Sequence, residues 1–102
     1  MNIKMVNKGS SAELYLAGRI DASVAPQLQD ALLEVAERFD RIVLDFEKVP
    51  YISSAGLRAL RVLHKAMRQK NGSFALRNVR KDVVDVFNIT GFGVLLDYEE
   101  MQ

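Results

Sequence analysis

Residues 41–57 read RIVLDFEKVPYISSAGL, and this stretch decides the fold class. It opens with a short continuous apolar run, 41–46, of the kind found in a central strand that is covered on both faces. A turn at 48–50 follows, and two serines then lead into a segment of helical periodicity that continues to about residue 70. Strand, turn and helix in this order predict one unit of an α/β protein.

Two amphipathic helices are predicted. The first starts near Ser23, which we expect to act as its N-cap, with Pro26 tolerated in the first turn. Its outer side carries an acidic row, and the outer side of the second helix carries a basic row, because residues three and four apart share one face of a helix. The acidic row consists of Asp30, Glu34 and Glu37, and the basic row of Arg58, Arg61, Lys65 and Arg68.

The remaining segments predict a hairpin at the start of the chain and shorter elements near its end. Apolar and polar residues alternate in 1–5 and in 12–16, on either side of a turn at 9–11. Later come a strand at 73–76, a third helix with apolar positions Val79, Val83, Val86 and Phe87, stop signals at Asn88 and Gly91, a last strand at 94–96, and a polar tail at 97–102 that is too short for more than the first turn of a further helix.

These elements predict one α/β domain over residues 1–102, with five strands and three full helices. A chain of 102 residues is too short for a second domain with a core of its own. The core should be formed by the apolar positions on the inner sides of strands and helices, namely Leu14, Leu16, Leu32, Val43, Leu44, Leu57, Leu60, Val83 and Phe87.

The composition argues against several classes of function. The net charge is +1, from 14 basic and 13 acidic residues, so no general field attracts nucleic acid or an anionic membrane. With one histidine, no cysteine and no nucleotide fingerprint, we expect no metal and no cofactor. Because no apolar run approaches about 20 residues and no secretion signal is present, we expect a cytoplasmic protein.

The sole histidine does not favour an enzyme. His64 lies ten residues after Ser54, on the same predicted helix. That spacing places it about 15 Å further along the helix axis, too far to act as a base for Ser54. Its position at the edge of the apolar face suits a structural or half-exposed side chain. A serine hydrolase is therefore disfavoured, and we expect a protein that is not an enzyme.

Ser53 and Ser54 stand where the chain leaves a strand and enters a helix, and two interpretations are open. One of them can serve as the helix cap. The same position also suits phosphorylation, because a phosphate would face unpaired backbone N–H groups at the positive end of the helix dipole and add about −1.5 to −2 charges. Arg58 is four residues after Ser54 and could approach that phosphate, and the basic row could steer an acidic partner.

Three segments of the chain resemble the STAS domain family, and within it the small stand-alone anti-sigma factor antagonists. They are GRID at 18–21, the stretch 42–58 and FNITGF at 87–92, and their order and spacing fit the family over nearly the whole chain. The resemblance implies a mixed sheet of about five strands with three to four helices packed mainly on one side. It also implies a protein-binding regulator of sigma-factor-dependent transcription.

In such antagonists a partner anti-sigma factor serine kinase of the GHKL type phosphorylates the serine that aligns with Ser54. The unphosphorylated antagonist binds the kinase and frees the sigma factor, and a serine phosphatase resets the switch. Asp21 matches an acidic position near the phosphorylated serine. The resemblance thus implies a monomer in the free state with a partner-binding surface at Asp21, Ser53, Ser54, Ala55, Gly56, Leu57, Arg58 and Arg61.

The chain departs from the family pattern in two places. Ser53 stands where the family often has Asp, which makes Ser53 an alternative phosphoacceptor. Many members also end with an amphipathic helix for which residues 97–102 are too short. The alternative function is that of a stand-alone STAS accessory subunit of a transport or signalling complex, without a phosphorylation switch.

Overall fold

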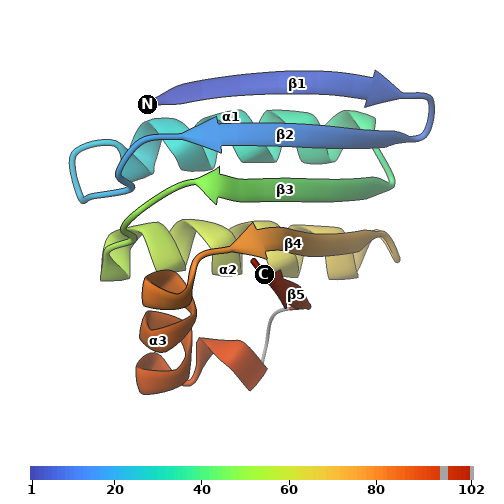
Figure 1. Cartoon of the computed structure of the whole chain (residues 1–102). Helices are drawn as coiled ribbons and strands as arrows, with labels where there is room; N and C mark the ends of the chain where they lie inside the picture. Colours follow the sequence, from blue (N-terminus) through green and yellow to red (C-terminus); the bar gives the residue numbers. More distant parts are fainter. Residues whose placement is uncertain (95–96, 102) are drawn as a thin grey trace.

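The computed structural model describes residues 1–94 and 97–101. Strands and helices alternate after an initial hairpin, as expected for an α/β protein (Figure 1). In chain order the elements are β1 (Asn2–Lys8), β2 (Ser11–Ala17), α1 (Ala25–Arg38), β3 (Arg41–Lys48), α2 (Ser54–Gln69), β4 (Ser73–Val79), α3 (Lys81–Thr90), a 3₁₀ turn η1 (Phe92–Val94) and β5 (Tyr98–Glu100).

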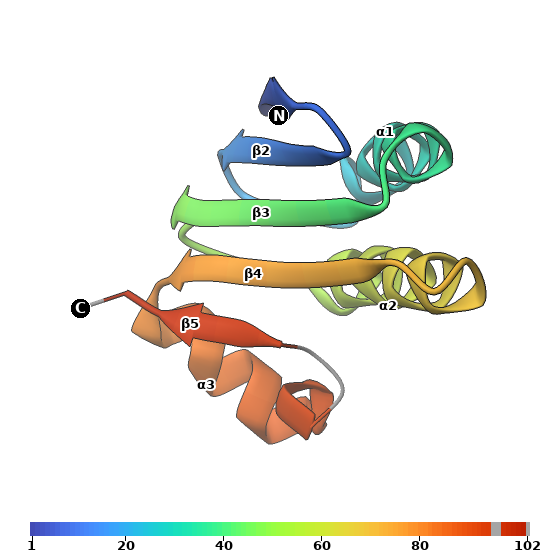
Figure 2. The same ribbon diagram turned by 90° about the vertical axis from the view of Figure 1, so that its right-hand side faces the viewer.

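The five strands form one sheet in the order β1-β2-β3-β4-β5. β1 pairs antiparallel with β2, and every later neighbouring pair is parallel. α1 and α2 lie side by side on the same face of this sheet, and α3 lies beside its β4–β5 end (Figures 1 and 2). The mixed sheet with helices mainly on one side confirms the expected fold class.

The core lies between the sheet and the α1–α2 layer. Strand side chains that point to the helices, such as Leu14, Leu44 and Phe46, are almost completely buried. Eight of the nine expected core residues are buried, and Val43 is the exception. Val43 is half-buried and alternates with the buried Ile42 and Leu44, so it points to the opposite face of the sheet. Neither α1 nor α2 covers that face (Figure 2), so the expectation that β3 is covered on both faces was wrong.

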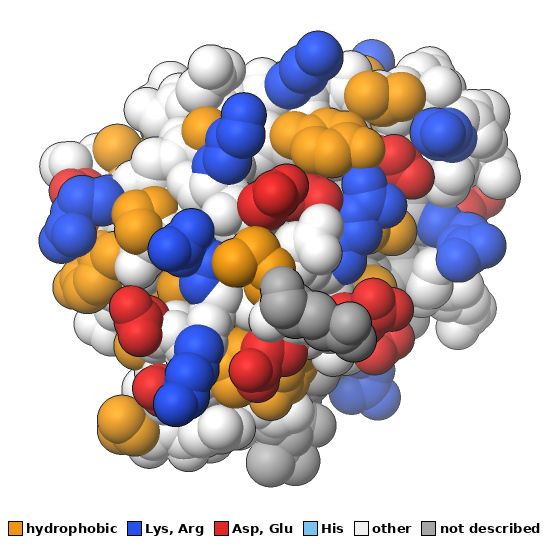
Figure 3. All heavy atoms as spheres, viewed as in Figure 1, with side chains coloured by type: hydrophobic (Ala, Val, Ile, Leu, Met, Phe, Trp, Pro, Cys, Tyr) orange, Lys and Arg blue, Asp and Glu red, His pale blue; other side chains and the backbone are white. Residues whose placement is uncertain are grey.

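The face of the sheet opposite α1 and α2 is largely polar, with acidic and basic side chains interspersed (Figure 3). Tyr15, Asp45 and Arg77 occupy the same level of three neighbouring strands, because Tyr15 pairs with Asp45 and Asp45 with Arg77 in the sheet register. Successive strand residues alternate between faces, so all three side chains point to this open face. The register therefore brings together residues far apart in the sequence.

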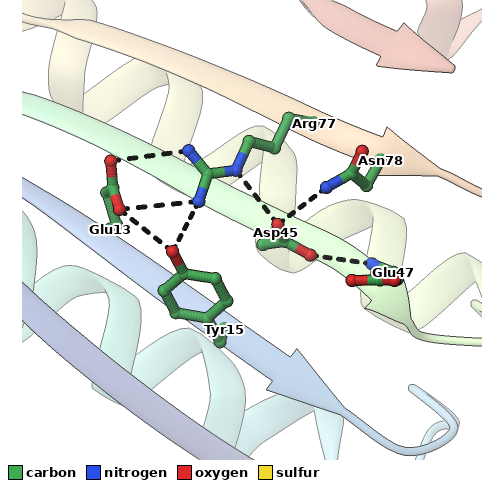
Figure 4. A network of polar contacts seen from close by, with 6 residues as sticks. All are labelled: Glu13, Tyr15, Asp45, Glu47, Arg77 and Asn78. Carbon is green, nitrogen blue, oxygen red and sulfur yellow. Dashed lines mark hydrogen bonds and ion pairs between the residues drawn. The ribbon is translucent and has the colours of Figure 1, made fainter. Parts of the chain in front are cut away.

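Arg77 is the centre of a polar network on this open face (Figure 4). Its Nε donates to Asp45 Oδ2 at 3.0 Å, one terminal nitrogen donates to the Tyr15 hydroxyl at 2.7 Å, and Glu13 accepts two longer contacts at 3.4 and 3.5 Å. Asn78 donates to Asp45 from a left-handed backbone position with φ 55°. The network neutralises Asp45, the one buried charged side chain among the described residues.

The start of α1 differs from the expectation. Val24, not Ser23, is the N-cap residue, and its side chain makes no capping bond. Ser23 instead donates through its backbone N and its hydroxyl to the Asp21 carboxylate. The Asp21 carboxylate therefore organises the turn before α1, as a short carboxylate commonly does, and does not replace the expected serine cap, because the groups it accepts from precede the helix.

The end of the chain also differs. Val79 ends β4 and does not begin the third helix, which starts at Lys81. α3 ends at Gly91, in the left-handed conformation with φ 80° that favours glycine. Of the strand expected at 94–96, Val94 belongs to the 3₁₀ turn, and residues 95–96 lie outside the described residues. The last strand is Tyr98–Glu100, within the segment taken for a polar tail.

Candidate functional site

The candidate site lies where the connections β2–α1 and β3–α2 meet. These two connections are joined by backbone hydrogen bonds: Ser53 N donates to Ile20 O at 2.7 Å, and Ile20 N donates to Tyr51 O at 2.9 Å. Ile20 and Ile52 form an isolated parallel bridge and are both buried. The pairing brings the GRID segment and the two serines, over 30 residues apart in sequence, into one corner of the molecule.

The two serines have different roles in this corner. Ser53 is the N-cap of α2, and its Oγ accepts a hydrogen bond from Gly56 N at 3.1 Å. Ser54 is the first residue of the helix and is exposed, and its hydroxyl makes no hydrogen bond within the described chain. Ser54 is therefore accessible to solvent at the start of this helix. The cap and the accessible hydroxyl are two separate residues.

Asp21 faces its own loop. Its Oδ1 accepts from Ser23 Oγ at 2.6 Å, from Ser23 N at 3.0 Å and from Val24 N at 3.3 Å. The Ser23 hydroxyl lowers the pKa of the Asp21 carboxyl, assisted by the backbone N–H groups of Ser23 and Val24 and by the charge of Arg19. Asp21 is therefore charged at neutral pH and fixes the loop that carries Ile20 to the serine corner.

Gly56 and Leu57 lie on the buried side of the first turn of α2, with 2 % of the Leu57 surface exposed. A Cβ on Gly56 would lie 2.6 Å from Ile20 Cγ2 and 2.8 Å from Ile52 Cγ1, so only glycine allows the helix to approach the two loops this closely. These two members of the expected binding surface can shape the corner but present no side chain to a partner. Ala55 is half-buried beside them.

The exposed part of the corner is basic. Arg58 and Arg61 are exposed on α2, one and two turns after Ser54. Ala55 and Arg58 line a shallow groove together with residues of the first turns of α1, including Ala25 and Asp30. An accessible hydroxyl, a helix N-terminus and exposed guanidinium groups thus occupy one surface.

One pair of residues at this site was not predicted from the sequence. The Arg19 guanidinium lies 4.3 Å from the centre of the Tyr51 ring, and Tyr51 is 38 % exposed. Both flank the joined loops, Arg19 next to Ile20 and Tyr51 next to Ile52. Tyr51 could have been noted in the sequence as an aromatic residue shortly before the serines. Its contact with Arg19 could not, because that contact depends on the pairing of the two loops. The pair adds an aromatic and cationic contact surface beside Ser54.

His64 and the potential metal-ligating side chains bear on the enzyme and metal alternatives considered from the sequence. His64 is half-buried and lies near Phe74, with 6.4 Å between the ring centres and an angle of 54° between the ring planes. No group of three or more potential metal-ligating side chains occurs in the described part of the chain. None of the described helices has both the length and the apolar character needed to cross a membrane.

Comparison with known proteins agrees with this architecture. The model of the STAS domain matches residues 2–99. The chain belongs to the STAS domain family. It is 27 % identical over 97 residues to the anti-sigma-B factor antagonist of Bacillus subtilis strain 168, a match that covers 95 % of this chain and 89 % of that protein.

Two solved structures show the same fold. The anti-sigma factor antagonist SpoIIAA in its unphosphorylated form has a TM-score of 0.81 at 17 % identity, over 95 % of this chain and 87 % of that one. The Bacillus cell fate determinant SpoIIAA in the phosphorylated form has a TM-score of 0.74 at 16 % identity, over 95 % and 90 %. At these identities the likeness establishes the fold alone.

Proposed function

We propose that this STAS domain is an anti-sigma factor antagonist that binds an anti-sigma factor serine kinase and is switched by phosphorylation of Ser54. The observation that carries the proposal is the division of labour between the two serines. The Ser53 hydroxyl caps α2, whereas the neighbouring Ser54 hydroxyl is exposed and makes no hydrogen bond within the described chain. Ser53 is the alternative phosphoacceptor, but its phosphorylation would use the hydroxyl that caps α2.

A phosphate on Ser54 would change the surface without requiring the fold to change. It would add about −1.5 to −2 charges at the positive end of the α2 dipole. The exposed Arg58, one turn further on, is within reach for a charge-assisted hydrogen bond. A partner that fits the unphosphorylated corner would then have to bury a phosphate, or to contact an Arg58 that is already bound to that phosphate, and both weaken binding.

The partner surface in this proposal consists of the accessible groups around Ser54, while Gly56 and Leu57 support it from below. The basic row on α2 would attract an acidic edge of the kinase. Support comes from the relative named anti-sigma-B factor antagonist and from the neighbour SpoIIAA, whose phosphorylated and unphosphorylated forms have both been solved. A GHKL-type kinase, a serine phosphatase, a cytoplasmic location and a non-enzymatic role complete the proposal.

The test is incubation with an anti-sigma factor serine kinase of the GHKL type from the same organism. Mass spectrometry of the wild type should place one phosphate on Ser54, Ser54→Ala should abolish it, and Ser53→Ala should retain it. Ser54→Asp should weaken kinase binding at least about tenfold in isothermal titration calorimetry, and Ser54→Ala should leave it unchanged. Equal affinities for the Asp and Ala variants would refute the switch.

A result without phosphorylation of either serine would favour the alternative, a STAS accessory subunit that docks through the same corner. Capture of a transport or signalling component by the wild type, with affinity unaffected by Ser54→Asp, would then identify that role.

A further inference from the structure

The outer surface of the helix layer is divided into an acidic and a basic half. Asp30, Glu34 and Glu37 on α1 are all exposed, and so are the four cations of the basic row on α2. None of these seven side chains forms an ion pair within the described chain. Side chains of both rows point away from the buried faces of their helices, so their charges are available to another molecule.

An apolar seam separates the two rows. The groove between the first turns of the helices is lined by Gln29 on α1 and Ala55 on α2, among others. Leu33 lies one turn beyond Gln29 and Val62 two turns beyond Ala55, so they continue this groove along the helices. Both are half-buried. The surface therefore has an apolar centre flanked by charged edges, which is the composition of a protein interface.

The two rows are also matched in height. α1 and α2 run in the same direction side by side (Figure 1), and Asp30 and Arg58 line the same groove, so we take them to lie at a similar height along the helices. Glu37 follows Asp30 by seven residues, and Lys65 follows Arg58 by seven residues. At the same rise per residue, Glu37 and Lys65 are therefore level as well.

We propose that two copies of this chain pair face to face through the α1–α2 layer. A twofold axis parallel to the helices leaves the position of every residue along the helix axis unchanged. It places α1 of one copy opposite α2 of the other. Asp30 of one copy then faces Arg58 of the second copy, Glu37 faces Lys65, and the two apolar seams meet in the middle. A twofold axis across the helices would instead set acid against acid and base against base, so the charges select one arrangement.

The dimer should be weak. Helices of 14 and 16 residues are about 21–24 Å long, and two side by side offer on the order of 450 Å² per copy. About 900 Å² in total is at the low end for specific association. The monomer expected from the sequence is then the dilute form, and the dimer forms at high protein concentration and low salt, where charges are least screened.

Sedimentation velocity across a protein concentration series tests the proposal with the purified chain alone, in about 0.02 M and about 1 M salt. The wild type should dimerise at low salt and dissociate at high salt. Glu37→Lys and Lys65→Glu each set like charges against each other at two symmetry-related contacts, so each should raise the dissociation constant about tenfold or more. Asp85→Lys and Lys81→Glu, exposed on α3, are the controls with the same change in net charge and should dimerise like the wild type.

The decisive sample is an equimolar mixture of the Glu37→Lys and Lys65→Glu proteins. In the mixed dimer each reversed residue faces the other reversed residue, and the unaltered Lys65 and Glu37 face each other, so both contacts are attractive again. The mixture should recover the wild-type dimer while each variant alone stays monomeric. A wild type that remains monomeric at low salt overturns the proposal. So does a mixture that fails to associate while the wild type dimerises, because the contact would then lie elsewhere. No kinase is involved, so either result is independent of the proposed phosphorylation switch.

Discussion

The two faces of the sheet are stabilised in different ways, and β3 allows a direct comparison because its successive residues point to opposite faces. Ile42, Leu44 and Phe46 are buried under α1 and α2. On the open face, Asp45 is 6 % exposed and is surrounded by hydrogen bonds instead of apolar atoms. Burial of apolar area should therefore dominate stability on one face, and charge should do so on the other.

The largest effect should come from the helix-covered face. Leu44→Ala removes a fully buried side chain and should lower the free energy of unfolding by about 3 kcal/mol. Val43→Ala, one residue earlier on the open face, should lower it by about 1 kcal/mol, because Val43 is already in partial contact with water. Urea denaturation of both variants gives the comparison. Equal losses would mean that the two faces contribute alike.

A smaller effect, with a distinct pH dependence, should come from the open face. Arg77→Met keeps much of the apolar stem but removes the cation from Asp45, and should cost about 2 kcal/mol at pH 7. Burial alone raises the pKa of Asp45, but hydrogen bonds from Glu47 N, Arg77 and Asn78 outweigh it and lower the pKa below the ordinary 3.8.

The lowered pKa fixes the direction of the pH effect. A carboxyl whose pKa is lower in the folded state contributes stability above its unfolded pKa, and loses that contribution as the pH falls through the folded value. The stability deficit of Arg77→Met should therefore be largest near neutral pH and should shrink below the ordinary aspartate pKa of 3.8. Denaturation curves of wild type and variant at several pH values measure this. A deficit that does not change with pH would assign the role of Arg77 to packing. Lys48→Met, an exposed change on β3, the strand that carries Asp45, is the control.

The order of helices and strands could be predicted from the sequence because hydrophobic periodicity is local. Features that depend on strand register, or on pairing between distant segments, could be seen only in the structure. An apolar run such as 41–46 does not reveal which of its faces is covered, so Val43 was assigned to the core. Likewise, Arg77 meets Asp45, 32 residues away, only because parallel pairing places them at the same level.

The candidate site also combines features that could be predicted from the sequence with features that could not. The position of Ser53 and Ser54 at a helix start follows from a strand, a turn and an apolar periodicity in one continuous stretch. The close approach at Gly56 depends on Ile20, which the β2–α1 loop brings in from 36 residues away. The turn that Asp21 forms with Ser23 could not be distinguished by sequence from a cap at Ser23, since Asp and Ser both favour the start of a helix.

The smallest effect on stability should be the difference between alanine substitutions of the two serines at the start of α2. Ser53→Ala removes the acceptor for Gly56 N and should lower the free energy of unfolding by about 1 kcal/mol. Ser54→Ala removes a hydroxyl that makes no hydrogen bond within the described chain and replaces it with the best helix former, so stability should change by less than about 0.5 kcal/mol. Thermal and urea denaturation of the two variants measure the difference. A larger loss from Ser54→Ala than from Ser53→Ala would mean that the caps are exchanged in solution, and Ser53 would then be the hydroxyl available for modification.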